Sequence, residues 1–402
     1  MSFQQGLSGL NAAAKNLDVI GNNVANSNTA GFKQGVATFG DVFAASLGGG
    51  GGIEVGIGTQ LSSVGQQFSQ GNVTVTNNPL DVAINGKGFF RMSDNGLISY
   101  TRNGGFSLDK NGYVVGSNGM NLTGFQAVSG TIVPGVMGNL RMSNSDLLPT
   151  ATLNASVGAN LASSDSIKLT GGLIPANPST YNFSTASTVY DSLGQSHTIT
   201  YYFNKSAANT WDASVYLDGA PANGAGVTTL TFDNSGSYGG ASNPVKTAVL
   251  TNGADPLSIT MDYTGMTQYG SGFGVNSMTQ DGFASGQLTG YTIGADGTIL
   301  GRYNNGRSQT LGQIALVNFN NAQGLKPMGA SQWAESSDSG SPLSGAPGTA
   351  SLGALQSSAK EDSNVDLTAE LVNMITAQRV YQANAQSIKT QDAVLQTLVN
   401  LK

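Results

Sequence analysis

Residues 363–402 read SNVDLTAELVNMITAQRVYQANAQSIKTQDAVLQTLVNLK, a stretch with neither glycine nor proline. Within it, one set of positions recurs at steps of three and four residues, which is the spacing of a helix face that packs against a partner helix. Asn364 or Asp366 can cap this helix, and Glu370 is favourably placed near its positive N-terminal end. At 1.5 Å per residue the predicted helix is about 50–55 Å long. The positions on the packing face are Leu371, Met374, Gln378, Tyr381, Ala385, Ile388, Asp392, Leu395 and Val399.

A second helix is predicted at the other end of the chain, about 35–40 Å long. Ser2 followed by Gln5 fits a capping box at its start. One interpretation is an antiparallel pair packed onto one globular domain. The alternative is packing between copies of the chain, because the C-terminal helix is longer than any core here requires and its polar Gln378 and Asp392 would set the register of an assembly. The packing face of the N-terminal helix comprises Leu7, Leu10, Ala14, Leu17, Gly21 and Val24.

The middle of the chain is predicted to be rich in β-structure. The sequence holds 56 glycines, and Asn-Gly occurs at 85, 95, 103, 111 and 118. Such spacing predicts successive hairpins with type I′ turns, which need positive φ at both central positions. We therefore expect residues 79–128 to form a compact β-meander.

A second β region begins near residue 145. In WDASVYL and HTITYYF, apolar and polar residues alternate as they do in strands with one buried face. Glycine-rich residues 48–52 and the Ser/Gly/Pro-rich run 336–351 indicate flexible connectors. The fold class is mainly β with long terminal α-helices, which pair in a coiled-coil-like core followed by two nested β domains. The expected parts are a helical core (1–30 with 364–402), linkers (31–70 with 345–363), a proximal β domain (71–144 with 284–344) and an inserted distal β domain (145–283).

Composition restricts the class of function. Of 402 residues only 10% are charged, the net charge is −6, and cysteine is absent. The negative charge argues against nucleic acid as a partner, and neither disulfides nor thiolate metal sites are available. The chain shows no secretory signal peptide and no run long enough to span a membrane, so composition alone indicates a cytoplasmic protein.

Residues with the chemistry of an active site are scarce. The single histidine, His197, lies in an alternating strand, and a structural place on the strand face is expected for it. Asp109 begins a DKNG turn, but no glutamate follows at the twelfth position of a calcium loop. Gly86-Lys87-Gly88 lacks the spacing of a phosphate-binding loop. We therefore predict no catalytic residue, no cofactor and no metal ligand.

Three segments identify a family. The run NLDVIGNNVANSNTAGFK follows the N-terminal helix; NPLDVAINGKGFF and YTRNGGFSLDKNGYVVGSNGMNLTGF follow further on. Together with the C-terminal helix, they resemble the bacterial flagellar axial proteins, which include rod, hook and hook-associated subunits. The resemblance implies that the first run joins the helix to the β shell, for which an ordinary helix C-cap and surface loop is the alternative, and Gly31 suits a tight turn. Its linker residues are Asn22, Asn23, Asn26, Gly31, Phe32 and Lys33.

The insertion distinguishes members of this family, because its rod proteins lack a large domain between the two halves of the β domain. Residues 145–283, with TVYDSLGQSHTITYYFNK, resemble the inserted domain of hook members. This resemblance implies a self-assembling, curved hook tube that acts as a universal joint and transmits torque from rod to filament. It implies as partners other copies of the chain, the distal rod protein, the hook cap protein, the hook-filament junction protein and the flagellar type III export apparatus.

The resemblance also implies export through that apparatus without a signal peptide, and so a place in the flagellum outside the cell. Phe39 and Phe43 resemble a short aromatic export motif, for which a structural role is the alternative. Two other functions stay open: a distal rod or hook-associated axial protein, and, from a different class, a secreted β-rich adhesin or glycan-binding module. An enzyme is the least favoured class.

Overall fold

The computed structural model describes residues 2–42, 56, 58–142, 146–168, 173–222, 226–240 and 244–400. The chain divides into two compact units. Unit 1 consists of Met1–Asn144, Gly290–Arg302 and Ser308–Lys402, and unit 2 of Ser145–Thr289 and Tyr303–Arg307. The insertion therefore folds as a body of its own.

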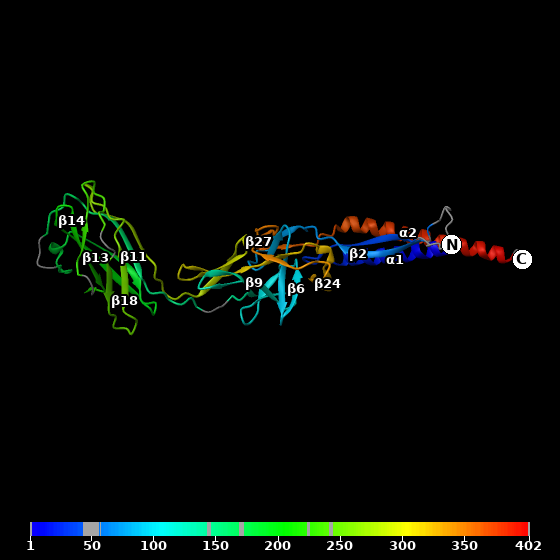
Figure 1. The fold of residues 1–402 in the computed structure, drawn as a ribbon, viewed down its shortest axis with the longest axis horizontal. Coiled ribbons are helices and arrows are strands. Elements are labelled where there is room, and N and C mark those ends of the chain that lie inside the picture. The colour runs from blue at the N-terminus through cyan, green and yellow to red at the C-terminus, as the bar shows by residue number, and fades with distance from the viewer. Residues whose placement is uncertain are drawn as a thin grey trace. The chain divides into compact units, whose positions relative to one another are not determined.

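Two helices from opposite ends of the chain lie side by side in unit 1 (Figure 1). Helix α1 spans Ser2–Ala25 and α2 spans Leu367–Asn400, which are 24 and 34 residues. At 1.5 Å per residue they are about 36 and 51 Å long. Asp366 caps α2, because its Oδ1 accepts from the backbone N–H groups of Thr368 (2.8 Å) and Ala369 (3.1 Å).

The segments next to the helices form short antiparallel pairs. Strand β1 (Gly35–Val42) pairs with β2 (Gly58–Gln66), and this hairpin packs against α1 (Figure 1). Returning strands join the two halves of the chain: β28 (Ala359–Glu361) pairs with β3 (Val73–Val75), and β27 (Ala354–Ser357) with β4 (Val82–Asn85). The segment before α2 is thereby hydrogen-bonded to strands that follow α1 in the chain.

The body of unit 1 is a large sheet, to which thirteen strands contribute among the described residues. Its central path runs β20-β21-β22-β9-β5-β6-β25-β24, with the remaining strands attached to β9, β5 or one another. Its strands are β5 (Phe89–Asp94), β6 (Leu97–Thr101), β7 (Phe106–Leu108), β8 (Val114–Gly116), β9 (Asn121–Val128), β10 (Thr131–Asn139), β20 (Leu288–Ile293), β21 (Thr298–Tyr303), β22 (Ser308–Ile314), β23 (Leu316–Asn318), β24 (Lys326–Gly329), β25 (Gln332–Ala334) and β26 (Leu343–Gly345).

This sheet differs in two ways from the predicted meander. Strand β9 lies beside β5, and β25 lies beside β6, so strands from both halves of the chain are interleaved. Of the five Asn-Gly pairs, only Asn95-Gly96 has positive φ at both residues. The prediction of type I′ turns was wrong for the other four; at Asn111, for example, Asp109 Oδ1 caps the turn by accepting from the N–H groups of Asn111 and Tyr113.

The described residues of unit 2 form two sheets. One contains β12 (Phe183–Tyr190), β13 (Ser196–Ala207), β14 (Thr210–Leu217), β15 (Ala220–Pro221) and β16 (Thr228–Thr231). The other contains β11 (Asn154–Asn160), β17 (Val245–Ala248), β18 (Leu257–Asp262) and β19 (Gly274–Gln280). Both sheets contribute side chains to one hydrophobic cluster.

The alternating strands of unit 2 have the expected buried faces. In β14 the residues Trp211, Ala213, Val215 and Leu217 are buried, and the indole N–H of Trp211 donates to Gln268 at 2.8 Å. Because the buried N–H of Trp211 is paired, the indole ring can occupy the core without an unsatisfied polar group.

The structure also has short 3₁₀ turns. One, Pro178–Thr180, precedes the sheet that contains β14, and another, Ala322–Gly324, lies in unit 1.

The predicted connectors have different outcomes. The run 336–351 is part of the fold, since β26 pairs with β23 and Ser339 is buried, so the prediction of a flexible connector there was wrong. The glycine run 48–52 lies outside the described residues.

The predicted fold class, mainly β with paired terminal helices, is confirmed. None of the described helices is long and apolar enough to cross a membrane.

Candidate assembly site at the paired terminal helices

The contact between α1 and α2 uses small residues on α1. Gly6, Ala13, Ile20 and Asn23 are the buried positions of this helix. A Cβ on Gly6 would lie 3.0 Å from the side chain of Ile388, and one on Gly9 only 2.8 Å from that of Asn384. The absence of side chains at Gly6 and Gly9 therefore lets the two helix backbones approach closely.

Of the predicted packing positions, Ile388 takes part in this contact, and several others are exposed. On α1, Leu7 is 44% exposed, and Leu10, Ala14, Leu17 and Val24 are half-buried. On α2, Met374, Ala385 and Ile388 are half-buried, and the side chain of Val399 is outside the described residues. The remaining predicted positions, Leu371, Gln378, Tyr381, Asp392 and Leu395, are exposed.

Helix α2 presents an apolar surface to solvent. Large apolar side chains between 37% and 58% exposed occur along its length. At 3.6 residues per turn these positions lie on several sides of the helix, so the apolar surface follows α2 along its length and is not confined to one face. So many exposed apolar side chains on one helix mark protein–protein contacts. This set, which we call the apolar row, comprises Leu367, Leu371, Val372, Ile375, Val380, Tyr381, Val394 and Leu395.

The linker after α1 is held by reciprocal hydrogen bonds. Asn23 is buried; its Nδ2 donates to the carbonyl of Gly35 and its Oδ1 accepts from the Gly35 N–H, both at 2.8 Å. The turn at Asn26 continues the helix, with its backbone N–H donating to the carbonyl of Asn22. Gly31 has φ +70°, and a Cβ there would lie 2.5 Å from the backbone nitrogen of Asn103. A tight turn and a close approach thus coincide at Gly31.

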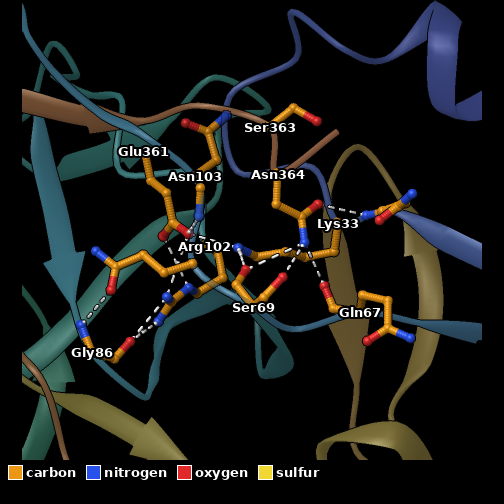
Figure 2. Close-up of polar contacts among 12 residues, drawn as sticks. Lys33, Gln67, Ser69, Gly86, Arg102, Asn103, Glu361, Ser363 and Asn364 are labelled. Carbon is orange, nitrogen blue, oxygen red and sulfur yellow. Dashed lines mark hydrogen bonds and ion pairs between the residues drawn. The ribbon is translucent and has the colours of Figure 1, made fainter. Parts of the chain in front are cut away.

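Three buried charges join the linker, the β sheet and the strand before α2 (Figure 2). Lys33 Nζ lies 2.6 Å from Glu361 Oε1, and Arg102 Nε lies 3.0 Å from Glu361 Oε2. The side chains of Lys33 and Glu361 are completely buried, and that of Arg102 is 4% exposed. Lys33 also donates to the carbonyl of Ser69 at 2.7 Å. We call Lys33, Arg102 and Glu361 the junction cluster.

Burial controls the titration of this cluster. Desolvation lowers the pKa of Lys33, and the nearby Glu361 opposes this change without cancelling it. The pKa of Arg102 is lowered for the same reason, again against the effect of Glu361. Two cations share one carboxylate, so Glu361 is the group whose loss would leave both charges buried and unpaired.

Carbonyl groups complete the environment of Arg102. Its Nη1 donates to the carbonyl of Gly88 at 2.6 Å, and both terminal nitrogens donate to the carbonyl of Gly86 at 3.0 Å. The Gly86-Lys87-Gly88 segment thus binds a guanidinium through its carbonyls. Asn364, a few residues after Glu361, accepts from the N–H of Gln34 and donates to the carbonyl of Gln67, both at 2.8 Å (Figure 2).

Sequence reasoning missed Glu361 and Arg102. The chain has only four glutamates, so a glutamate five residues before the cap of a long helix was the available signal for Glu361. It also missed the small-residue contact on α1, whose signal was the spacing of Gly6, Gly9 and Ala13 by three and four residues.

The predicted aromatic residues take no part in the junction cluster as far as the structure describes them. Phe32 is half-buried and lines a pocket with Gln66, Pro327 and Trp333. Phe39 lies within β1 and is half-buried, and Phe43 is outside the described residues.

Unit 2 holds a separate polar group around His197. Its Nδ1 lies 2.7 Å from Asp218 Oδ2, and its Nε2 lies 3.2 Å from Asp191 Oδ2. Burial would lower the pKa of His197, but hydrogen bonds to Asp218 and Asp191 outweigh it and hold the pKa above its ordinary value. Among the described residues, no group of three or more acidic or histidine side chains is arranged to hold a metal ion.

Comparison with protein families matches four segments of the chain to models of flagellar proteins. Residues 3–33 match the flagella basal body rod protein model, and residues 83–160 match the D1 domain of flagellar hook protein FlgE/F/G. Residues 160–283 match the D2 domain of flagellar basal body protein FlaE, and residues 356–401 the C-terminal model of flagellar basal body rod FlgEFG protein.

Relatives that match over their whole length are flagellar hook proteins. The chain is 43% identical to flagellar hook protein FlgE of Escherichia coli K12 over 410 residues, with all of both chains covered. It is 42% identical to flagellar hook protein FlgE of Salmonella typhimurium LT2, again with all of both chains covered. It is 31% identical to flagellar hook protein FlgE of Borreliella burgdorferi, covering 100% of this chain and 99% of the relative.

The crystal structure of Helicobacter pylori flagellar hook protein FlgE2 has the same fold. Its TM-score is 0.51 at 15% sequence identity, over 67% of this chain and 96% of that one. The chain belongs to the flagellar hook protein family, whose members are structural components of the hook.

Proposed function

We propose that this chain is the subunit of a curved, flexible hook tube that transmits torque from the rod to the filament as a universal joint. The observation that supports it most is the exposed apolar row on α2, whose members extend from Leu367 to Leu395. A chain with this surface gains stability by burying it against other copies. Contacts of a head-to-tail kind that do not close produce an open helical filament.

The proposed parts of the subunit follow the predicted boundaries. Residues 1–30 with 364–402 form the polymerisation core, and 31–70 with 345–363 connect it to the shell. Residues 71–144 with 284–344 form the proximal β domain, and 145–283 form the distal domain. The predicted packing positions, Leu7 to Val24 on α1 and Leu371 to Val399 on α2, contact neighbouring copies in this proposal.

The partners in this proposal are those of an axial subunit. Besides itself, the chain contacts the distal rod protein, the hook cap protein and the hook-filament junction protein. It reaches the outside of the cell through the flagellar type III export apparatus, without a signal peptide. Phe39 and Phe43 are the proposed export motif. A structural role is proposed in place of catalysis.

The first experiment is deletion of this gene, followed by electron microscopy of basal bodies from the source bacterium. We expect complete rods with hooks and filaments missing, and restoration of both by the wild-type gene on a plasmid. Missing or truncated rods would move the chain to the rod instead. Complete, normal flagella would refute the proposal and favour a β-rich adhesin or glycan-binding module.

A further inference from the structure

A polar pocket of about 300 Å³ lies between α1, α2 and β1. It is lined from α1 by Asn16 and Asn23, from β1 by Gly35 and Val36, and from α2 by several residues that begin with Glu370. The pocket lies beside the exposed apolar row, since Val380 belongs to both. A neighbouring copy that covered the row would therefore reach this pocket.

Glu370 lines this pocket, and one of its carboxylate oxygens has no hydrogen-bond partner among the described residues. Glu370 is only 3% exposed, and its Oε1 accepts from the side-chain amides of Gln34 and Asn23. Its Oε2 is buried and accepts no hydrogen bond. A buried carboxylate oxygen without a donor is costly, and a cation that supplied donors would remove that cost.

The other polar side chains of the pocket are of the kind that accept hydrogen bonds from a cation. Asn16 and Asn373 line it and make no side-chain hydrogen bond with any described residue. A guanidinium has five N–H donors in a planar fork, so it can bond to a carboxylate and to amide oxygens at the same time. The pocket suits an arginine better than it suits a bare ammonium.

The described parts of the two helices contain three cations. Lys15 pairs with Asp18 at 3.3 Å, whereas Arg379 and Lys389 on α2 are exposed and have no partner among the described residues. Arg379 is nine residues from Glu370, which places it about 180° around the helix and about 13 Å along it. It therefore points away from its own pocket but lies at the height of the pocket's far end, near Val380.

We propose that Arg379 of one copy enters the pocket of a neighbouring copy and pairs with Glu370 Oε2. This inference rests on the proposed function, because it needs the chains to associate. Donor and acceptor lie on opposite faces of one helix, which is the arrangement that a head-to-tail contact requires. The pair sets the register of α2 between copies, while the apolar row supplies the burial.

The test is a double-mutant cycle on full-length chains assembled into hooks. Glu370→Gln, Arg379→Gln and the double variant each replace the wild-type gene, and hooks are isolated from the cells. The measured quantity is the concentration of soluble chain in equilibrium with these hooks. We expect each single change to raise it about tenfold, and the double change to raise it no further than the stronger single one.

Lys389→Gln is the matched control, because Lys389 is also an exposed, unpaired cation of α2. Its effect should add to that of Glu370→Gln. The inference would be overturned if the effects of Glu370→Gln and Arg379→Gln on the soluble concentration were additive, or if Arg379→Gln left that concentration at the wild-type value. If Glu370→Gln and Lys389→Gln were not additive, Lys389 and not Arg379 would be the partner of Glu370. Arg379 is exposed, so its variant tests the pair without risk to folding. A wild-type chain absent from hooks would instead contradict the proposed function.

Discussion

At the scale of single residues, Glu361 neutralises two buried cations of unit 1. It is the one carboxylate between Lys33 and Arg102, and all three side chains are buried. Glu361→Gln keeps the shape of the side chain but leaves two buried cations without a counter-charge. We expect the free energy of unfolding to fall by about 3–5 kcal/mol, measured by urea denaturation.

Lys15 is the control for this prediction. It pairs with Asp18 at 3.3 Å on α1, and the side chains of the two residues are 63% and 69% exposed. Lys15→Gln should cost no more than about 1 kcal/mol, because water screens a pair at the surface. Equal costs for the two variants would show that burial of the junction cluster is not what makes Glu361 important.

Gly31 is the position at which backbone conformation and close packing coincide. Gly31→Ala places a Cβ at positive φ and 2.5 Å from the Asn103 nitrogen, so we expect a loss of about 2–4 kcal/mol in the free energy of unfolding. Gly119 also has positive φ, +80°, but no atom lies within 4 Å of its Cβ position. Gly119→Ala should therefore cost only about 1 kcal/mol, and a Gly31→Ala variant no worse than this would contradict the close approach.

His197 makes the stability of unit 2 depend on pH. Its pKa is higher in the folded chain than in the unfolded one, so the folded chain binds the proton more tightly. The stabilisation is fully present below the unfolded value of about 6.5 and is lost as the pH rises through the folded-state pKa.

The measurement is the Tm of the full chain between about pH 5 and pH 8.5, where carboxylates with lowered pKa stay ionised. We expect the unit 2 transition to fall by about 2–4 °C over this range. In His197→Gln this decrease should be absent. A decrease of the same size in the variant would assign the pH dependence to another group.

At the scale of elements, α2 has an apolar row that its own chain does not cover. Ile375 is 52% exposed, so Ile375→Asn should change the unfolding free energy of the monomer by less than about 0.5 kcal/mol. Burying such a side chain between copies stabilises by about 1.5–3 kcal/mol, so we expect at least about tenfold less polymer by sedimentation.

Gln382→Asn is the control, since Gln382 is an exposed polar residue of the same helix. It should assemble like the wild type. Normal polymer yield from Ile375→Asn, with the monomer equally stable, would show that this part of the row is not an assembly surface.

At the scale of the whole molecule, bending of a rotating tube requires neighbouring subunits to slide. Small polar side chains on the inserted domain permit many nearly equivalent contacts between copies. Ser184 and Thr188 are exposed on β12. We expect the double change Ser184→Leu and Thr188→Leu to straighten or freeze the hook, as measured by its curvature in electron micrographs and by swimming.

The Tm of the purified double variant serves as the control, and it should equal that of the wild type because neither side chain is in the core. Unchanged curvature and normal swimming would count against sliding of the inserted domain as the basis of bending.

Local pattern and composition by themselves determined the helices, the alternating strands of unit 2 and the membership of the axial family. Helix periodicity, strand alternation and capping depend on residues close in the chain, so α2 and the buried face of β14 could be predicted. The turns at Asn-Gly were predicted less well, because the same pair suits more than one turn type and neighbouring aspartates such as Asp109 select among them.

Only the tertiary structure decided which partners meet. The junction cluster joins residues 33, 102 and 361, and no local signal specifies contacts over such separations. The contact between α1 and α2 brings Gly6 and Gly9 against the side chains of Ile388 and Asn384, because close approach of two backbones depends on the absence of side chains. Predicted packing residues such as Leu7 and Leu371 stay exposed on the surface, which a second copy can cover.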